Sequence, residues 1–438
     1  MTTQTETLSS PFPYNSQSQN NHLKIDLEQA HNPPKDVAPA EDDPSVFNFD
    51  DLPPFPDNVP VAPLLRISLH KLLTGEQEEV DRLWKACCEL GFFYLDLRGG
   101  RNEHLHTLRS PEQEELVDNV WKEHSSPATS PEASQPTHAR ETGVDGDQFL
   151  KSAYELFSVG DQVFDLPVEE KLKYDFKDQG SYFGYKGLGA GVIDSKGTKD
   201  RNEFYNVSKD DILGLSAPLP APEVLRPHRT LLKSYIEQSH AVVTLLLRLL
   251  NARLDLPREK LASLHRLHAA SGDQVRWVRA PPQPRDDRKT ALGEHTDFGS
   301  VTILFNRLGG LQVLPPGAEQ WCYVKPLKGH AVVNLGDAMV KFTAGVLRSN
   351  IHRVVNPPGR QGDATRMSLV YFARPEDDVL LKVLGGSGLI DGSRKGKAEF
   401  ENEEEITSKE WIKRRALGRR QGGDWEKSGG TEAGRAGD

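Results

Sequence analysis

The second half of the sequence predicts a β-sandwich or jelly roll, and the first half predicts helices that buttress it. After residue 270, seven short β-rich runs are separated by turn-forming pairs such as Gly309-Gly310 and Lys328-Gly329. Before residue 270, apolar residues recur at helical spacing in three long segments. The expected fold class is therefore α+β, with a mainly β half.

The β-rich runs combine β-branched and aromatic residues and are short. Strands of this length and spacing are typical of antiparallel sandwiches and jelly rolls, because tight turns join successive strands. The expected strands are residues 274–279, 300–305, 310–314, 321–324, 331–334, 350–355 and 367–372.

The helical half opens with a strand-helix-strand unit. Val80, Leu83 and Cys87 share one face of the first helix, which Gly91 ends. Pro257 is suited to the first turn of a later helix, because its missing N–H needs no partner there. The expected elements before residue 270 are strands at 61–67 and 92–97 and helices at 76–90, 148–164, 228–254 and 257 to about 267.

One ordered domain is expected at residues 56–395. It divides into a helical region, 56–270, and a jelly-roll region, 271–380. Residues 1–55 are rich in Asn, Gln, Ser and Pro, so they are expected to form a disordered leader. A loose insertion is expected at about 99–145, where the run Ser-Ser-Pro-Ala-Thr-Ser-Pro has low complexity.

Two short helices are expected in these looser parts of the chain. The insertion contains a candidate helix at 112–124. The charged tail, residues 396–438, contains another at 408–420, because Thr407 and Glu410 have the spacing of a capping box. This tail helix would either cover a pocket or pack elsewhere on the domain.

The charge and the cysteine content exclude several classes of protein. The formal net charge of −10 provides no basic surface for nucleic acid or for an anionic membrane. No apolar run is long enough to span a bilayer, and the first residues lack an apolar signal core. Three cysteines, two of them adjacent, cannot form a disulfide framework. We therefore expect a cytoplasmic monomer.

His295 and Asp297 form a candidate metal site with a distant histidine. In extended backbone, residues i and i+2 point to the same side, so this imidazole and this carboxylate can bind one face of a metal ion. His352, in the alternating run Asn-Ile-His-Arg-Val-Val, is a candidate third ligand from another strand. Two histidines and one carboxylate leave three positions open, as in non-haem Fe(II) oxygenases.

Arg366 and Ser368 have the same i, i+2 spacing on a later predicted strand. A guanidinium group matches a carboxylate with two parallel hydrogen bonds, and a serine hydroxyl adds a further donor. The pair could therefore hold the far carboxylate of a dicarboxylic cosubstrate whose other end binds the metal. The alternative is a strand arginine in a surface ion pair.

Taken in order, these motifs resemble the 2-oxoglutarate and Fe(II)-dependent dioxygenases, specifically the isopenicillin N synthase-like branch. Further similar runs are Gly-Gly-Leu-Gln-Val-Leu (309–314), Val-Asn-Leu-Gly-Asp (333–337), Ala-Cys-Cys-Glu-Leu-Gly-Phe-Phe (86–93) and Leu-Pro-Val-Glu-Glu-Lys (166–171). The resemblance covers most of residues 60–376. The run 200–208 is similar to filamentous-fungal members.

The resemblance implies a double-stranded β-helix, which is a jelly-roll variant, buttressed by helices. It implies Fe(II), 2-oxoglutarate and O2 as cofactor and cosubstrates, with ascorbate as a reductant in some members. Decarboxylation of 2-oxoglutarate to succinate and CO2 would drive hydroxylation, desaturation or ring closure of a small organic molecule in specialised metabolism.

One departure from the family pattern concerns the cosubstrate. Many relatives have Asn-x-Tyr before a Pro-Pro pair, and the tyrosine helps to bind 2-oxoglutarate. This chain has Val278-Arg279-Ala280 before Pro281-Pro282. A 2-oxoglutarate-independent Fe(II) oxidase of the same family is therefore an alternative.

The substrate pocket is expected in a Gly- and aromatic-rich stretch that resembles the family's pocket wall. Core packing is the alternative interpretation for its aromatic residues, and surface pairing is the alternative for its arginine. The candidates are Tyr182, Tyr185, Arg201, Asn202, Phe204, Tyr205 and Phe372. Arg276 and Arg279 could also attract an anionic substrate.

Two other classes of function use the same residues differently. A zinc hydrolase could employ two histidines and an aspartate, but it would leave Arg366 and Ser368 without a role. A non-catalytic small-molecule binding protein could retain the fold, although a site without catalysis would be free to lose a ligand. The identity of the substrate does not follow from the sequence.

Overall fold

The structure, a computed structural model, describes residues 49, 51–102, 143–288, 290–401, 404–420, 422–423 and 430. Almost all of the expected leader, most of the expected insertion and the expected helix at 112–124 lie outside these residues. Within the described part of the chain, no helix is both long enough and apolar enough to cross a bilayer.

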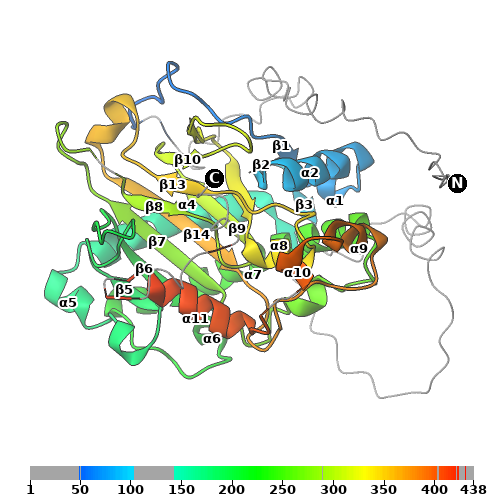
Figure 1. Ribbon diagram of the computed structural model, residues 1–438. Coiled ribbons are helices and arrows are strands. Elements are labelled where there is room, and N and C mark those ends of the chain that lie inside the picture. Colours follow the sequence, from blue (N-terminus) through cyan, green and yellow to red (C-terminus); the bar gives the residue numbers. More distant parts are fainter. Residues whose placement is uncertain are drawn as a thin grey trace, which may run out of the picture.

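Two β-sheets form a jelly-roll core (Figure 1). The larger sheet contains eight strands in the order β1 (Arg66–Ser68), β2 (Phe92–Asp96), β12 (His330–Leu335), β9 (Val301–Asn306), β14 (Arg366–Ala373), β7 (Gln274–Ala280), β6 (Glu203–Ser208) and β5 (Gly184–Lys186). The smaller sheet contains β11 (Cys322–Tyr323), β10 (Leu311–Val313), β13 (His352–Val354) and β8 (Leu292–His295). A short separate pair consists of β3 (Arg101–Asn102) and β4 (Val144–Asp145).

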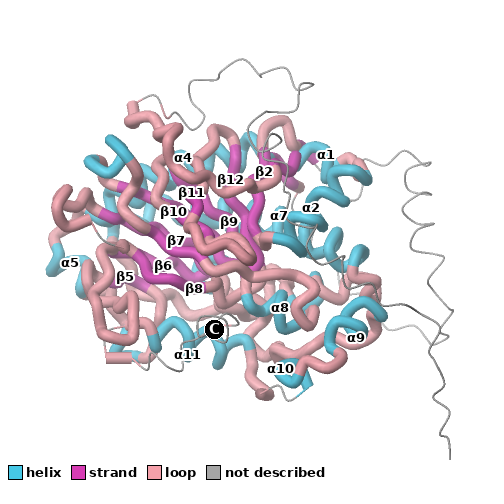
Figure 2. The backbone as a smooth tube through the Cα atoms, turned by 45° about the horizontal axis from the view of Figure 1, so that its top comes forward, coloured by secondary structure: helices cyan, strands magenta, loops and turns pink. Residues whose placement is uncertain are grey.

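Helices surround the sheets (Figure 2). They are α1 (Leu69–Leu73), α2 (Gln77–Glu89), α4 (Gly146–Phe164), α5 (Val168–Leu172), α6 (Lys209–Leu213), α7 (Arg229–Arg253), α8 (Asp337–Phe342), α9 (Gly388–Arg394), α10 (Ala398–Glu401) and α11 (Ser408–Gly418). The long helices α4 and α7 pack on the larger sheet, where Phe149 of α4 meets Phe305 of β9 with ring centroids 5.3 Å apart. The Trp277 indole of β7 donates a hydrogen bond to the Leu156 carbonyl of α4 (2.7 Å).

Strand β14 separates the hydrophobic core from the interior of the jelly roll. Met367, Leu369 and Tyr371 belong to the main hydrophobic core that also includes α4 and α7. The alternate residues, including Arg366 and Ser368, line a cavity on the other face. Side chains alternate along a strand, so this one sequence serves both packing and a ligand site.

The expected jelly roll with helical buttresses is confirmed. All seven strands expected after residue 270 are present within a few residues of their expected bounds, and so are the helices that correspond to α2, α4, α7 and α11. Strand β8 was not among the seven. It follows a polar loop and contains only four residues, so its pattern is too short to stand out.

The predicted strand at 61–67 is mostly absent, because only β1 at its end is a strand. Val61 forms a single bridge to Tyr323. Pro63 follows and has no backbone N–H to donate to a ladder, which accounts for the interruption.

The helix predicted to begin at Pro257 is also wrong. That region consists of turns and a short 3-10 helix, Ala262–Leu264. The Asn251 side chain of α7 accepts a hydrogen bond from the Leu261 N–H (2.9 Å), which folds the chain back against α7. Glu259 has a positive φ of 59°, which an α-helix does not allow.

Candidate active site

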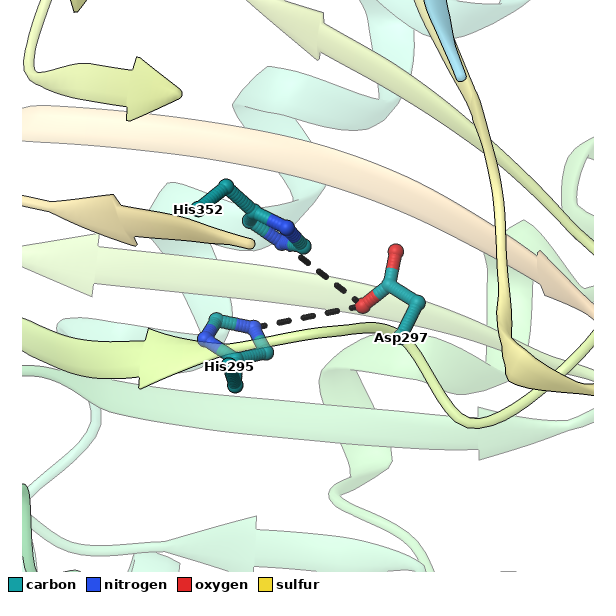
Figure 3. Close-up of side chains that lie close together, drawn as sticks. All are labelled: His295, Asp297 and His352. Carbon is teal, nitrogen blue, oxygen red and sulfur yellow. Dashed lines mark ion pairs between the residues drawn. The ribbon is translucent and has the colours of Figure 1, made fainter. Parts of the chain in front are cut away.

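His295, Asp297 and His352 converge in the interior of the jelly roll (Figure 3). His295 ends β8, and His352 begins β13 directly opposite it in the antiparallel pairing. Asp297 lies in the loop just after β8. One ligand atom of each of the three side chains lies within 4.8 Å of the others, and the Asp297 Oδ1 atom is 3.9 Å and 3.8 Å from the two Nε2 atoms.

Hydrogen bonds behind the three side chains orient their ligand atoms. The Nδ1 atom of His295 lies 2.8 Å from the Gly293 carbonyl, and that of His352 lies 3.1 Å from the Asn350 carbonyl. A carbonyl can only accept, so Nδ1 carries the proton and the Nε2 lone pair is free to bind a metal.

The carboxylate of Asp297 is oriented in the same way. Its Oδ2 atom accepts hydrogen bonds from the Thr302 hydroxyl (2.6 Å) and from the Asn334 amide (2.7 Å). Oδ1 therefore remains for a metal ion. The sequence did not identify Thr302 or Asn334 as parts of the site, although the run Val-Asn-Leu-Gly-Asp belongs to the family resemblance.

The protonation states suit a divalent cation. Burial lowers the pKa of His295 well below its usual value, and the nearby His352 lowers it further. Burial alone would raise the pKa of Asp297, but the two imidazoles and the hydrogen bonds from Asn334 and Thr302 outweigh burial and lower it. A neutral His295 imidazole and an ionised Asp297 carboxylate are ligand forms that bind a metal, so these residues fit Fe(II).

Helix α11 packs against the segment that carries His295 and Asp297. Side chains of the helix and of its C-cap residue Arg419 donate hydrogen bonds to three backbone carbonyls of that segment: Arg419 to Glu294 (3.2 Å), Arg415 to Thr296 (3.3 Å) and Trp411 to Phe298 (3.1 Å). The fully buried Arg415 also pairs with Asp337 (2.5 Å), which accepts from the Thr296 hydroxyl (2.9 Å). The helix thus supports the segment, and its residues do not line the cavity.

Arg366 and Ser368 face the same cavity as the three candidate ligands. The Arg366 guanidinium donates hydrogen bonds to the Gly309 carbonyl (2.7 Å) and to the Ser368 hydroxyl (2.6 Å). Among the described residues, no carboxylate forms an ion pair with it. Burial lowers the pKa of Arg366 to about 10, so it remains charged at neutral pH. A buried cation without an internal anion is costly, so the arrangement suits an anionic ligand.

The cavity lies between the two sheets. The empty space within it measures about 950 Å³, and part of this space is open to solvent. Its apolar lining comes from both sheets and the connecting loops: Phe92, Phe298, Leu304, Leu311, Val354 and Val370. Such a lining favours a small organic molecule with an apolar body.

Some residues that the sequence assigned to the substrate pocket do line this cavity. Phe372, Asn202 and Arg276 are among them. Phe204 is not, but its ring stacks on the Arg276 guanidinium at 4.1 Å. Tyr182 lies behind Arg374, whose guanidinium is 5.3 Å from its ring centroid.

Three others do not line the cavity. The Tyr185 hydroxyl donates to Glu203 (2.6 Å) in a buried cluster. Arg201 pairs with Asp287 (2.7 Å). Tyr205 lines a separate hollow beside Arg229. On β6, the side chains of residues 203 and 205 point away from the cavity face, which explains why Tyr205 does not line the cavity.

Arg374 lines the cavity but was missed. The i, i+2 spacing that links 366 and 368 continues through 370 and 372 to 374. Extending that alternation would have found it.

Comparisons with known proteins agree with this geometry. Residues 272–375 match the family model described as the 2OG-Fe(II) oxygenase superfamily, and residues 146–225 match the one described as non-haem dioxygenase in morphine synthesis N-terminal. A 2-oxoglutarate-dependent dioxygenase of Aspergillus fumigatus is 31% identical over 356 residues, which cover 76% of this chain and 80% of that protein. The 2-oxoglutarate-dependent dioxygenase frbH of a Dothideomycetidae species is 31% identical over 75% of this chain and 87% of its own length.

Solved structures agree on the fold. Full-length Neurospora crassa T7H, in complex with alpha-KG and 5-formyluracil, superposes with a TM-score of 0.56 at 20% identity, over 81% of this chain and 96% of that one. The rice dioxygenase for auxin oxidation has a TM-score of 0.50 at 22% identity, over 82% and 97%. Because the family models and the sequence relatives agree with this fold and with the cavity geometry, the chain belongs to the 2OG-Fe(II) oxygenase superfamily, as a 2-oxoglutarate-dependent dioxygenase of the fungal type that uses Fe(II), 2-oxoglutarate and O2.

Proposed function

We propose that His295, Asp297 and His352 bind Fe(II), and that Arg366 and Ser368 bind the far carboxylate of 2-oxoglutarate. The observation that carries this assignment is the meeting of three ligand atoms within 4.8 Å, each oriented by a hydrogen bond behind it. The same cavity extends from these three ligand atoms to the buried Arg366.

The bound Fe(II) supplies the chemistry that couples decarboxylation of 2-oxoglutarate to oxidation of a C–H bond. The chain's own residues position the reactants. Ser368 accepts a hydrogen bond from Arg366, so its own proton is directed elsewhere and can be donated to a carboxylate. The apolar lining excludes water and holds a substrate carbon near the metal ligands.

Ala280 lines the cavity at the position where many relatives have the cosubstrate-binding tyrosine. We infer that Arg366 and Ser368 hold the far carboxylate without that hydroxyl. This difference favours one second candidate, a 2-oxoglutarate-independent Fe(II) oxidase. Oxygen uptake that is retained when 2-oxoglutarate is omitted would support that candidate.

The reaction is proposed to be hydroxylation, desaturation or ring closure of a small organic molecule in specialised metabolism. The N-terminal family model, whose description refers to morphine synthesis, supports this class of substrate. The test is a screen of small molecules for substrate-stimulated release of succinate with Fe(II) and 2-oxoglutarate. Release that needs both supports the proposal. Turnover that persists without oxygen and with Zn²⁺ would indicate a hydrolase instead.

We also propose that the protein is a cytoplasmic monomer with one catalytic domain at about 56–395, whose jelly-roll part is 271–380. The three cysteines are free, and burial raises the pKa of the thiols of Cys87 and Cys322, which suits structural cysteines in a reducing compartment. Light scattering of the purified chain would test the monomer, and limited proteolysis would test the domain bounds.

A further inference from the structure

Two more cationic side chains face the cavity in addition to Arg366. Arg276 lies on β7 and Arg374 follows the end of β14. In the pairing of these strands, Arg276 lies opposite Val370, four residues along β14 from Arg366. At about 3.3 Å per residue, the two positions are separated by roughly 13 Å along the strand. The cavity therefore has two cationic ends.

The packing around Arg276 holds its guanidinium in place without neutralising it. Its Nε atom donates a hydrogen bond to the Asn206 side chain (2.7 Å). Its guanidinium carbon lies 4.1 Å from the centroid of the Phe204 ring and 5.0 Å from that of Phe372. No carboxylate of the described residues forms an ion pair with it.

Arg374 is held in a similar way. Its Nη1 atom donates to the backbone carbonyl of Gly272 and to the Gln274 side chain. Its guanidinium lies 5.7 Å from the Phe372 ring centroid, on the same aromatic residue as Arg276. The buried Nε atom has no hydrogen-bond partner within the described residues. Here too, no ion pair with a described carboxylate is present.

The charges of the cavity lining do not balance. Three guanidinium groups and one carboxylate, that of Asp297, line it. In the proposed function, the two negative charges of 2-oxoglutarate offset those of the divalent metal, so the excess of two positive charges remains at the far end. Burial and the neighbouring Arg374 together lower the pKa of Arg276 to about 9, although the Asp297 carboxylate acts in the opposite direction.

We propose that Arg276 and Arg374 form a binding site for an anionic oxygen group of the substrate. The substrate is then a small organic anion with an apolar body, which lies between this pair and the metal ligands. This inference rests on the proposed function and deepens it. Phe298 and Val370, which also line the cavity, would contact the apolar body.

The test uses matched sets of compounds and two readouts. Each set contains a carboxylic acid, its primary amide and the phosphate monoester of the corresponding alcohol, all on the same alkyl or aryl body. Binding to the full-length protein is measured by thermal shift with and without Fe(II) and 2-oxoglutarate, and turnover is measured by succinate release. We expect anions to bind, with preference between carboxylate and phosphate identifying the source of the anionic group. Equal binding of acid and amide across the sets would overturn the proposal.

Variants of Arg276 test whether this residue causes the preference for anions. Arg276→Met should weaken anion binding by about 10- to 100-fold, because a charged hydrogen bond is lost, and Arg276→Lys should recover part of it. Arg266→Met removes the same charge from an exposed ion pair with Glu376 and should leave binding unchanged. A melting curve of each variant reports its folding. An anion preference that survives in a folded Arg276→Met protein contradicts the assignment.

The remaining outcomes separate this inference from the proposed function. Anions that bind the wild type but never stimulate succinate release would support the subsite and count against the enzyme assignment. Turnover of neutral compounds alone would support the enzyme and overturn the subsite. Calorimetry of the Arg276→Met protein gives one more outcome. If this variant binds 2-oxoglutarate more weakly and its anion preference is unchanged, Arg276 belongs to the cosubstrate site, and the proposed subsite is overturned.

Discussion

The cavity face of β7 and β14 and the neighbouring cluster around β5 and β6 both bury cationic side chains, but they treat them differently. In the cluster, Lys171 pairs with Glu203 (3.0 Å), and Lys186 pairs with Asp200. On the cavity face, Arg366 and Arg276 have no such carboxylate among the described residues. A buried cation with an internal anion has its charge satisfied within the fold, whereas a buried cation without one is available to a ligand.

The same contrast explains which aromatic residues lie where. Tyr185 belongs to the paired cluster, since its hydroxyl donates to Glu203. Phe372 belongs to the cavity, where its ring lies against two guanidinium groups without carboxylate partners. Tyr185 and Phe372, both predicted to line the pocket, therefore belong to a structural cluster and to the candidate ligand site, respectively.

The largest expected effect tests the centre of the cavity face. Asp297→Ala should lower succinate formation by at least about 100-fold, because losing a ligand exceeds the 10- to 100-fold effect of losing a hydrogen bond behind a ligand. The folding transition should remain, because the change removes the acceptor of the Thr302 and Asn334 hydrogen bonds but leaves the hydrophobic core intact. Glu294→Gln, a change of the nearby exposed carboxylate, is the control. Full activity of Asp297→Ala would refute the metal assignment.

In the cluster around β5 and β6, removal of a cation should lower the stability of the fold. Lys186→Met leaves the buried Asp200 without its partner, so the free energy of unfolding should fall by about 3 to 5 kcal/mol. Urea denaturation measures the loss, and the KM for 2-oxoglutarate in the folded protein should not change. The double variant Lys186→Met/Asp200→Leu should recover much of the stability. If the double variant is as unstable as the single one, packing rather than charge explains the loss.

On the cavity face, removal of a cation should change the KM for 2-oxoglutarate and leave the stability of the fold largely unchanged. Arg366→Met should raise the KM for 2-oxoglutarate by about 10- to 100-fold, because hydrogen bonds between charged groups are lost. Its melting temperature without ligand should not fall as in Lys186→Met, because no internal carboxylate loses its partner. A large loss of stability with an unchanged KM would remove the distinction between the two regions.

A smaller effect is expected for a residue that orients a proposed metal ligand. Thr302→Val keeps the shape of the side chain but removes one hydrogen bond to Asp297, so Fe(II) affinity should fall by about 10-fold. Anaerobic titration with Fe(II) measures this change. An altered KM for 2-oxoglutarate with unchanged Fe(II) affinity would contradict it.

The smallest expected effect is that of Ser368→Ala. It removes one neutral donor beside Arg366, which corresponds to about 1 kcal/mol, or roughly a fivefold rise in the KM for 2-oxoglutarate. Initial rates at varied 2-oxoglutarate concentration provide the measurement. An effect as large as that of Arg366→Met would mean that the serine, not the arginine, dominates binding.

The site could be predicted from the sequence where a short-range pattern determines geometry. Residues i and i+2 of extended backbone point to the same side, and this relation is local in the sequence. The pairs His295–Asp297 and Arg366–Ser368 can therefore be identified from the sequence alone. His352 could be added because the run around it alternates like a strand, and the family resemblance then supported it. The strands after residue 270 were recognisable for the same local reason.

The rest depends on contacts between segments far apart in the sequence. Whether Tyr185 faces a ligand or Glu203 depends on the register of β5 and β6, which no local pattern states. The turns after Pro257 depend on the Asn251 side chain of another helix. The role of α11 was likewise undecided, because a capping box specifies where a helix begins and not what it packs against.

The contacts of α11 also mean that the segment with two of the three proposed iron ligands depends on a distant part of the chain. Its carbonyls accept hydrogen bonds from Trp411, Arg415 and Arg419, which lie 113 to 125 residues further along the sequence. Domains generally fold as units, so the jelly roll and this remote brace form together. A complete pair of sheets is therefore not enough to finish the centre.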